Sequence, residues 1–219
     1  MNKKIMILAA GRGERLKPLT NTIPKALIEV RGKPLIIHHI EKCAASGYSD
    51  IVINLAHLGT KIQTALGNGK QWGVNITYSP EQSGGLETGG GIINALPLLG
   101  SNPFITINAD VYTDYDFSSL PELDDQLAHL VLVENPEHNE KGDFALNRNM
   151  LIENDTPTLT FAGIAMYHPQ FFNQQQATRQ SIVPLLREHA TNHQVSGEVH
   201  RGLWYDVGTP ERLDYINSI

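Results

Sequence analysis

Short apolar runs recur through the first 135 residues of this 219-residue chain, and a polar or glycine-rich segment follows each of them. The runs lie at Lys4–Ala10, Asp50–Leu55, Val74–Ser79, Phe104–Asn108 and His129–Glu134. Helix-patterned segments separate the first four, and this alternation predicts an α/β fold with a doubly wound, mostly parallel, Rossmann-like sheet. Ligands of such open sheets bind beyond the carboxyl ends of the strands, so we expect the functional residues there.

The pattern changes after Gly142. Strand-like segments at Phe144–Asn147 and Met150–Glu153 flank a turn, and they predict a small antiparallel or mixed extension that returns to the main sheet. Further strands are expected at Thr158–His168, Gln194–His200 and Leu203–Val207, and helices at Ile182–Thr191 and from Pro210 onward. Pro34 begins another helix, in which Cys43 lies on the apolar stripe, so we expect this cysteine to pack rather than react.

The segment that follows the first predicted strand is rich in glycine and in cations. Residues 8–27 read LAAGRGERLKPLTNTIPKAL, and Pro18 and Pro24 disfavour a continuous helix. Glycines let backbone N–H groups approach a ligand closely. The cations are Arg12, Arg15, Lys17 and Lys25, opposed only by Glu14. A polyphosphate is the ligand that this loop favours, and an exposed basic turn is the alternative.

Charge is distributed unevenly along the chain. Residues 1–33 hold eight Lys and Arg against two Glu, whereas the whole chain has a net charge of −6. A nucleic-acid-binding protein would spread basic residues over a face or groove, so the concentration here favours one small anionic ligand and no nucleic acid.

Two familiar phosphate-binding loops do not fit. The Walker pattern G-x-x-x-x-G-K-S/T is absent from the sequence. Gly11 and Gly13 match the start of the dinucleotide fingerprint, but Leu16 stands where its third glycine belongs. The histidines lack metal-site spacing such as H-E-x-x-H, and there is no G-x-S-x-G elbow of a serine hydrolase.

Length and composition limit the class of protein. A chain of 219 residues, 41% of them hydrophobic, suffices for one domain. No apolar run approaches the roughly 18–20 residues of a membrane span, and the N-terminal run leads into charge, unlike a signal peptide. A single cysteine cannot form an internal disulfide. We therefore expect a soluble cytoplasmic protein without membrane partners.

The N-terminal segment resembles the signature of the sugar-phosphate nucleotidyltransferases, LAAG-x-G-x-R-L-x-P-L-T followed by P-K-x-L, and fills every position of it. Asn108-Ala109-Asp110 and the segment WYDVGTPE at residues 204–211 resemble two further motifs of this family. The resemblance implies a nucleotidyltransferase type A fold and transfer of a nucleoside monophosphate from a nucleoside triphosphate to a sugar 1-phosphate, with release of pyrophosphate.

The resemblance also implies roles for individual residues. Asp110 and Asp206 would hold Mg²⁺, although an aspartate at a strand end is most often a turn or cap residue. Arg15 would act on the leaving pyrophosphate and Lys25 on the α-phosphate and the incoming phosphate. The implied nucleotide-binding residues are Ala10, Gly11, Gly13, Glu14, Arg15, Lys25, Glu81, Gly85 and Thr88.

A glycine-rich loop follows the third predicted strand. By resemblance it recognises the base, with Glu81 accepting a hydrogen bond from uracil N3–H and the backbone of Gly84 and Gly85 completing the contact. Gly89–Gly91 are expected either to let the backbone approach the nucleotide or to form a flexible turn before a helix at Ile92–Leu96.

Among short members of the family, the segments LETGGG, HNEKGDFAL and TFAGIAMYHP most resemble bacterial enzymes that use UTP and N-acetylmuramate α-1-phosphate in cell-wall recycling. Asn108, Gly142 and Glu153 are then candidates for sugar contacts, with Asn154 an equal alternative to Glu153. Residues 1–135 would form the nucleotide-binding part of a single domain, and residues 136–219 the sugar-binding extension and C-terminal metal motif.

The chain departs from larger family members at one point, since it lacks their second lysine, which contacts the sugar phosphate. Arg148, Arg179 and Arg201 are the candidate replacements. One alternative function is a guanylyltransferase of mannose 1-phosphate or another hexose 1-phosphate. Another is a catalytically silent nucleotide sensor, which would be expected to have lost Arg15, Lys25, Asp110 or Asp206, yet all four are present.

Overall fold

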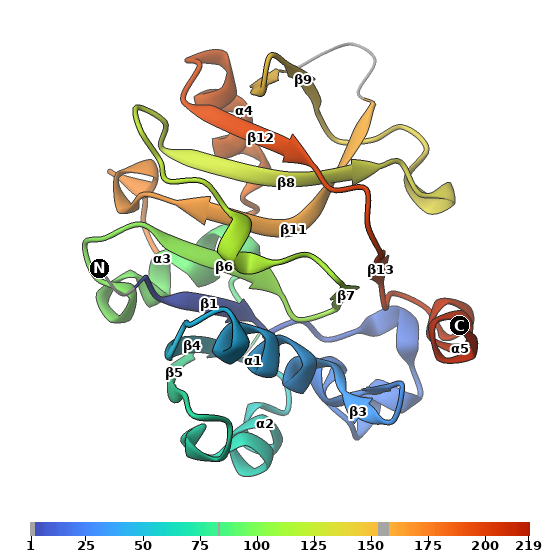
Figure 1. Ribbon diagram of the computed structural model, residues 1–219. Coiled ribbons are helices and arrows are strands. Elements are labelled where there is room, and N and C mark those ends of the chain that lie inside the picture. The colour runs from blue at the N-terminus through green and yellow to red at the C-terminus, as the bar shows by residue number, and fades with distance from the viewer. Residues whose placement is uncertain (1–2, 83, 153–157) are drawn as a thin grey trace.

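A computed structural model describes residues 3–82, 84–152 and 158–219 and contains one nine-stranded sheet (Figure 1). Half of this sheet is parallel, with the order β5, β4, β1 and β6. These strands are β1 Ile5–Leu8, β4 Asp50–Leu55, β5 Asn75–Pro80 and β6 Phe104–Asn108. The parallel α/β arrangement is therefore confirmed.

The other half of the sheet is mixed. The strand β11 lies antiparallel between β6 and β8, while β12 runs parallel to β8, and β10 and β9 complete the edge in antiparallel pairs. These strands are β8 Ala128–Glu134, β9 Ala145–Asn147, β10 Met150–Ile152, β11 Leu159–Tyr167 and β12 Val195–Val199. The extension after Gly142 returns to the main sheet as predicted, and it contributes four of the nine strands, β9 to β12. β11 joins it to β6, and β8 lies between β11 and β12 rather than in the parallel part.

Helices cover both faces of the sheet (Figure 1). Side chains of β1 alternate between the two layers: Ile5 and Ile7 belong to the core that α1 covers, and Met6 to the core that α3 covers. Burial on both faces explains why the parallel strands are continuous apolar runs. The helices are α1 Leu35–Ala45, α2 Gly59–Leu66, α3 Glu87–Leu99, α4 Val183–Thr191 and α5 Pro210–Ser218. None of the helices described is long and apolar enough to cross a membrane.

The helix α3 begins five residues earlier than the sequence suggested, so Gly89–Gly91 lie inside it rather than in a turn. A Cβ at Gly90 would stand 2.1 Å from the carbonyl oxygen of Thr178, and one at Gly91 would stand 2.6 Å from Glu81 Oε1. The missing side chains thus allow Thr178 and Glu81 to pack closely against the helix. The expectation of a flexible turn at these glycines is wrong.

Two short strands extend the architecture past the carboxyl ends of the parallel strands. β7 Val111–Thr113 follows β6 directly and pairs antiparallel with β13 Trp204–Asp206. Figure 1 shows this pair at the right of the sheet with α5 beside it. A second small pair joins β2 Glu29–Val30 to β3 Lys33–Pro34. The β7–β13 pair brings the C-terminal motif to the strand-end aspartate.

The segment between β1 and β2 forms no continuous α-helix, as its two prolines predict. It contains three single 3₁₀ turns, η1 Glu14–Leu16, η2 Leu19–Asn21 and η3 Lys25–Leu27. The remaining 3₁₀ turns are η4 Lys70–Trp72, η5 Phe117–Ser119, η6 Glu137–Asn139 and η7 Pro169–Phe172. Cys43 is fully buried on α1, and this burial raises the pKa of its thiol. Both observations agree with the predicted packing role of the cysteine.

Candidate active site

A cavity of about 400 Å³ opens beyond the carboxyl ends of β1 and β6. It combines the loop after β1, the loop after β5, the first turn of α3 and the end of β6. Its lining is Leu8, Ala9, Ala10, Gly11, Arg12, Gly13, Lys25, Ala26, Asn54, Glu81, Gly84, Gly85, Glu87, Thr88, Asn108, Ala109, Asp110 and Arg179. The position agrees with that expected for an open α/β sheet.

The loop after β1 is held in a tight conformation at Gly13, whose φ of +65° is left-handed. Its carbonyl oxygen accepts hydrogen bonds from Thr20 Oγ1 at 2.9 Å and from the Leu16 backbone N–H at 2.9 Å. A Cβ at Gly13 would stand 2.8 Å from Thr20 Cγ2, whereas one at Gly11 would meet nothing within 4 Å. The loop therefore turns sharply at Gly13 and stays open toward the cavity at Gly11.

Glu14 and Arg15, both predicted to bind nucleotide, lie on η1 and outside the cavity lining. Glu14 forms an ion pair with Lys17, and this hydrogen bond lowers the pKa of the Glu14 carboxyl. Arg15 is exposed and lies near His138, because its positive charge contributes to the lowered pKa of that histidine. Contact of either side chain with a nucleotide stays a prediction.

Glu81 lies in the cavity wall, but both of its carboxylate oxygens already accept hydrogen bonds from the protein. Oε1 accepts from Asn54 Nδ2 at 2.6 Å, and Oε2 accepts from the Leu86 backbone N–H at 2.7 Å. Gly85 lies beside this carboxylate, where a Cβ would stand 3.8 Å from Oε2. Each oxygen keeps a second lone pair that could accept another hydrogen bond, and contact of Glu81 with uracil stays a prediction.

Asn54 is the residue that the sequence reasoning missed in this region. It is the last residue but one of the apolar strand β4 and is only 2% exposed, and its Oδ1 accepts a hydrogen bond from the Ala9 backbone N–H at 2.7 Å. Together with its bond to Glu81, this contact joins the loop after β1 to the loop after β5. A polar residue within a buried strand was the signal that could have revealed it.

The C-terminal half of the chain supplies one wall of the cavity through Arg179. Its Nε lies 3.0 Å from Glu87 Oε1, and both side chains are exposed. Two backbone hydrogen bonds hold this segment against α3, one from Gln180 N–H to Leu86 O and one from Gly90 N–H to Gln180 O. Thr88 lies in the first turn of α3 beneath it.

The β7–β13 pair places the backbone of Asp206 beside that of Asp110, because Asp206 pairs with Val111 and the Val207 N–H donates to the carbonyl oxygen of Asp110 at 2.8 Å. Asp110 lines the cavity and Asp206 is not part of its lining, so joint binding of a metal stays a prediction. Asp110 Oδ2 lies 2.5 Å from Lys25 Nζ. Asp206 Oδ1 lies 2.5 Å from Arg212 Nη1 and 3.0 Å from His138 Nε2. Positive groups therefore contact both carboxylates.

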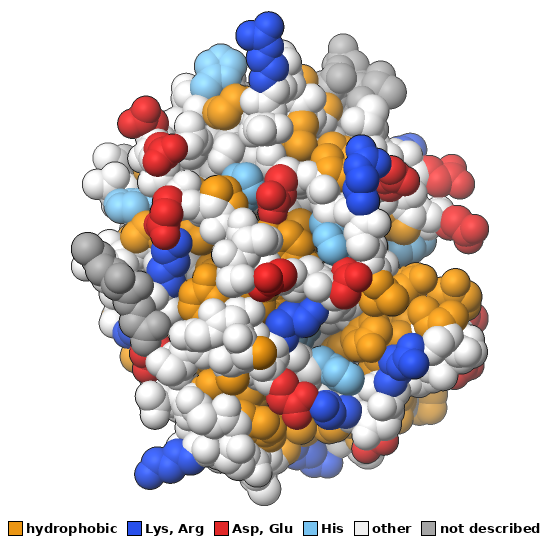
Figure 2. Space-filling model, viewed as in Figure 1, with side chains coloured by type: hydrophobic (Ala, Val, Ile, Leu, Met, Phe, Trp, Pro, Cys, Tyr) orange, Lys and Arg blue, Asp and Glu red, His pale blue; other side chains and the backbone are white. Residues whose placement is uncertain are grey.

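His138 and Arg212 were not recognised as site residues from the sequence. His138 belongs to η6 and Arg212 to α5, so only the fold brings them to Asp206. Removal from water lowers the pKa of His138, with Arg212 and Arg15 acting in the same direction and Asp206 against them. On the face shown in Figure 2, acidic, basic and histidine side chains are interspersed, and hydrophobic side chains gather at the right-hand edge.

The three predicted sugar contacts are placed differently from one another. Asn108 lines the cavity at the end of β6, and Gly163 on β11 lies against it, since a Cβ there would stand 2.6 Å from Asn108 Nδ2. Gly142 is not part of the lining and packs against Asn135. Glu153 and its alternative Asn154 lie outside the residues that the structure describes.

Comparison with known proteins adds independent information. The family profile described as Nucleotidyl transferase matches residues 4–146. The N-acetylmuramate alpha-1-phosphate uridylyltransferase of Neisseria meningitidis serogroup B is 51% identical, over 99% of this chain and 97% of that protein. A mannose-1-phosphate guanyltransferase of Aspergillus oryzae is 30% identical, over 98% of this chain and 63% of that protein.

The fold of the chain resembles that of a solved structure over nearly its whole length. The inositol-1-phosphate CTP transferase from T. maritima superposes with a TM-score of 0.78 at 16% identity, over 98% of this chain and 96% of that one. At this identity the likeness concerns the fold alone, and it agrees with the predicted nucleotidyltransferase architecture.

Proposed function

The chain belongs to the nucleotidyl transferase family, and on that premise we propose that it transfers UMP from UTP to N-acetylmuramate α-1-phosphate. The observation that carries the proposal is 51% identity over nearly the full length to a uridylyltransferase of this sugar phosphate. The cavity supports it, because one space is lined by a glycine-rich loop, by Lys25 and by the strand-end carboxylate of Asp110.

In the proposed reaction, an oxygen of the sugar 1-phosphate attacks the α-phosphorus of UTP in line. The bond from the α-phosphorus to the bridging oxygen of the β-phosphate breaks, and pyrophosphate leaves with that electron pair. No protein nucleophile is needed, since the sugar phosphate brings its own anionic oxygen. The work of the protein is to hold two anions that repel each other and to stabilise the charge that develops between them.

The residues of the loop after β1 would perform most of this work. Backbone N–H groups between Ala10 and Gly13 would bind the phosphates. Lys25, which reaches the cavity from η3, would contact the α-phosphate and the incoming phosphate, while Arg15 would contact the leaving pyrophosphate. Glu81, Gly85 and Thr88 would bind the nucleoside at the other end of the cavity, and Asn108 the sugar.

Asp110 and Asp206 would together hold a magnesium ion. Both carboxylates are partly buried at the same edge of the sheet, and each is in contact with a cationic side chain. Magnesium usually binds one or two carboxylates, waters and a substrate phosphate, so two carboxylates suffice. When bound, it would neutralise charge on the phosphate oxygens. Within the described residues no cluster of three or more metal-ligating side chains occurs.

The proposal extends to the organisation of the chain and to its setting. Residues 1–135 would form the nucleotide-binding part and residues 136–219 the sugar-binding part of one domain. The two parts would share the nucleotide site, since Arg179 belongs to the second part and lines the nucleotide cavity. The reaction would occur in the cytoplasm, where nucleoside triphosphates are available, and would return N-acetylmuramate to peptidoglycan synthesis.

A second candidate is guanylyl transfer to mannose 1-phosphate. It is favoured by 30% identity to the Aspergillus oryzae guanyltransferase over most of this chain. The lower identity and the 63% coverage of that longer protein make it the weaker candidate.

A pyrophosphate-release assay tests the proposal. The chain is incubated with Mg²⁺, each of four nucleoside triphosphates and a panel of sugar 1-phosphates that includes those of N-acetylmuramate, mannose and glucose. We expect the highest kcat/KM with UTP and N-acetylmuramate α-1-phosphate. Preference for GTP and mannose 1-phosphate would select the second candidate, and absence of turnover with every pair would refute transferase activity.

A further inference from the structure

The two carboxylates proposed to bind metal are each neutralised by a cation of the protein. Lys25 lies 2.5 Å from Asp110, and Arg212 lies 2.5 Å from Asp206. The side chains of Arg212 and Asp206 are only 21% and 18% exposed, so both charges are largely removed from water. A pair of this kind is a strong local interaction, and each partner is costly to leave alone.

The local backbone is built to place Arg212 on Asp206. The helix α5 begins directly after the aspartate, with Thr209 as its cap, and the Thr209 hydroxyl accepts a hydrogen bond from the Arg212 backbone N–H. The guanidinium then folds back across Gly208. A Cβ at Gly208 would stand 2.1 Å from Arg212 Nη2 and 2.8 Å from Asp206 Oδ2. Only glycine therefore permits this contact.

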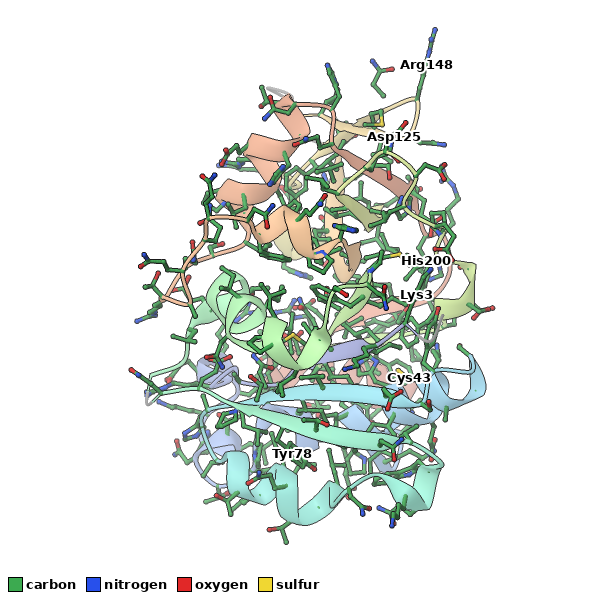
Figure 3. All side chains as sticks on the ribbon, turned by 90° about the vertical axis from the view of Figure 1, so that its left-hand side faces the viewer. Lys3, Cys43, Tyr78, Asp125, Arg148 and His200 are labelled. Atoms are coloured by element: carbon green, nitrogen blue, oxygen red, sulfur yellow. The ribbon has the colours of Figure 1, made fainter. Side chains whose placement is uncertain are left out.

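The other arginines considered as replacements for the family's second lysine are less suitable. Arg148 extends from the top of the molecule in Figure 3, in the turn between β9 and β10 at the far edge of the sheet. Arg201 pairs with Glu134, and both side chains are more than 70% exposed. Arg179 lies at the end of the cavity that Glu87 and Thr88 form.

We infer that Arg212 is a substrate-binding residue that holds Asp206 in the free protein and contacts the phosphate of the sugar 1-phosphate during the reaction. The inference rests on the proposed function. A divalent cation held by Asp206 would draw on the same carboxylate that the guanidinium contacts. A displaced guanidinium has five donors and no acceptor, so it requires an anion within reach of its side chain. The phosphate that meets the metal site supplies two oxygens for a bidentate contact.

A purely structural role for Arg212 makes the opposite prediction for the metal. If the arginine only orients Asp206, its removal weakens metal binding and catalysis together. If it competes for Asp206, its removal strengthens metal binding in the absence of substrates and weakens binding of the sugar phosphate. The sign of the change in metal affinity thus separates the two roles.

The test uses the full chain with Arg212→Met, which removes the charge at similar length, and Arg212→Lys, which keeps the charge but not the planar pair of donors. Arg201→Met is the matched control, because it also breaks an arginine–carboxylate pair. Mn²⁺ binding to each protein without substrates is measured from the electron paramagnetic resonance signal of free Mn²⁺. Initial rates at saturating UTP give the KM of the sugar 1-phosphate.

We expect Arg212→Met to bind Mn²⁺ several-fold more tightly and to raise the KM for the sugar phosphate by about tenfold or more, because one charge-assisted contact is lost. Arg212→Lys should fall between it and the unmodified chain, and Arg201→Met should change neither quantity. Weaker or unchanged Mn²⁺ binding, or an unchanged KM for the sugar phosphate, would overturn the inference. If the unmodified chain turns over no substrate pair, the proposed function fails, and the Mn²⁺ titration alone decides whether Arg212 competes for Asp206.

Discussion

Replacement of Asn54 by alanine tests whether the buried link between the two nucleotide-binding loops determines affinity for UTP. The Asn54 side chain accepts from the Ala9 N–H at 2.7 Å and donates to Glu81 Oε1 at 2.6 Å. Asn54→Ala removes both bonds at a site that is 2% exposed. It leaves a buried N–H group and one carboxylate oxygen without these partners.

The magnitude follows from the two bonds. A neutral hydrogen bond contributes about 1 kcal/mol, and one to a charged group about 1.5–3 kcal/mol. The total of about 3 kcal/mol is shared between the stability of the fold and the order of the two loops. If half of it appears in nucleotide binding, the KM for UTP rises by about tenfold.

The assay compares the KM for UTP at saturating sugar phosphate with the free energy of unfolding in urea. Asn94→Ala is the matched control, because Asn94 on α3 donates through Nδ2 to Ser79 Oγ on β5 at 3.0 Å but does not line the cavity. It should lower stability to a comparable degree and leave the KM for UTP unchanged. Gly91→Ala should disturb the same hydrogen bond between Asn54 and Glu81, since the new Cβ would stand 2.6 Å from Glu81 Oε1.

The reasoning is refuted if Asn54→Ala keeps the KM for UTP within about twofold of the unmodified chain while losing stability as calculated. It is also refuted if Asn94→Ala raises the KM for UTP as much as Asn54→Ala does. In either case Asn54 would serve the fold alone.

Three further predictions concern the site and the core. Lys25→Ala should lower kcat by about 100-fold or more, with an unchanged circular dichroism spectrum, because among the described residues Lys25 is the only lysine in the lining of the cavity; near-normal turnover would remove it from the mechanism. Asp206→Asn should raise the Mg²⁺ concentration needed for half-maximal rate, and an unchanged metal titration would make Asp206 a turn residue only. Burial lowers the pKa of His39 to about 4, so between that value and about 6.5 the unfolded chain binds a proton that the folded chain does not. The free energy of unfolding should therefore fall by about 2 kcal/mol from about pH 7.5 to about pH 5, measured in urea. The loss should be smaller in His39→Leu, and an equal loss would assign it to other groups.

The sequence predicted the parts of the fold that depend on local pattern. The boundaries expected for the strands at Asp50–Leu55 and Phe104–Asn108 are those observed, because apolar runs with polar ends leave little choice of register. Membership of the nucleotidyltransferases is also confirmed, since it rested on a dozen fixed positions in one segment. Ala10, Gly11, Gly13, Lys25, Glu81, Gly85, Thr88, Asn108 and Asp110 all line the cavity.

The features that the sequence did not predict depend on contacts between distant segments. The glycines in the first turns of α3 pack against a distant segment, since the carbonyl oxygen of Thr178 lies against Gly90 although 88 positions separate them. Arg212 reaches Asp206 through a helix cap and a glycine, and His138 reaches it from a loop 68 positions away. No periodicity of the sequence indicates such contacts, so they can be recognised only in the folded structure.

The structure also changes the meaning of the excess positive charge in the first 33 residues. Lys3, Lys17, Lys25 and Lys33 are each paired with an acidic side chain, and among these pairs only Lys25 with Asp110 lies in the cavity. A phosphate that binds Lys25 must therefore replace or share this carboxylate. A cation at Asp110 frees the ammonium, so metal and nucleotide should strengthen each other's binding by the same factor, as linkage requires. Asp110→Asn removes the charge that restrains Lys25, and it should raise UTP affinity measured calorimetrically without metal while reducing the gain on adding Mg²⁺. If UTP binding without metal is instead weakened in this variant, the ion pair orients Lys25 for the nucleotide rather than restraining it.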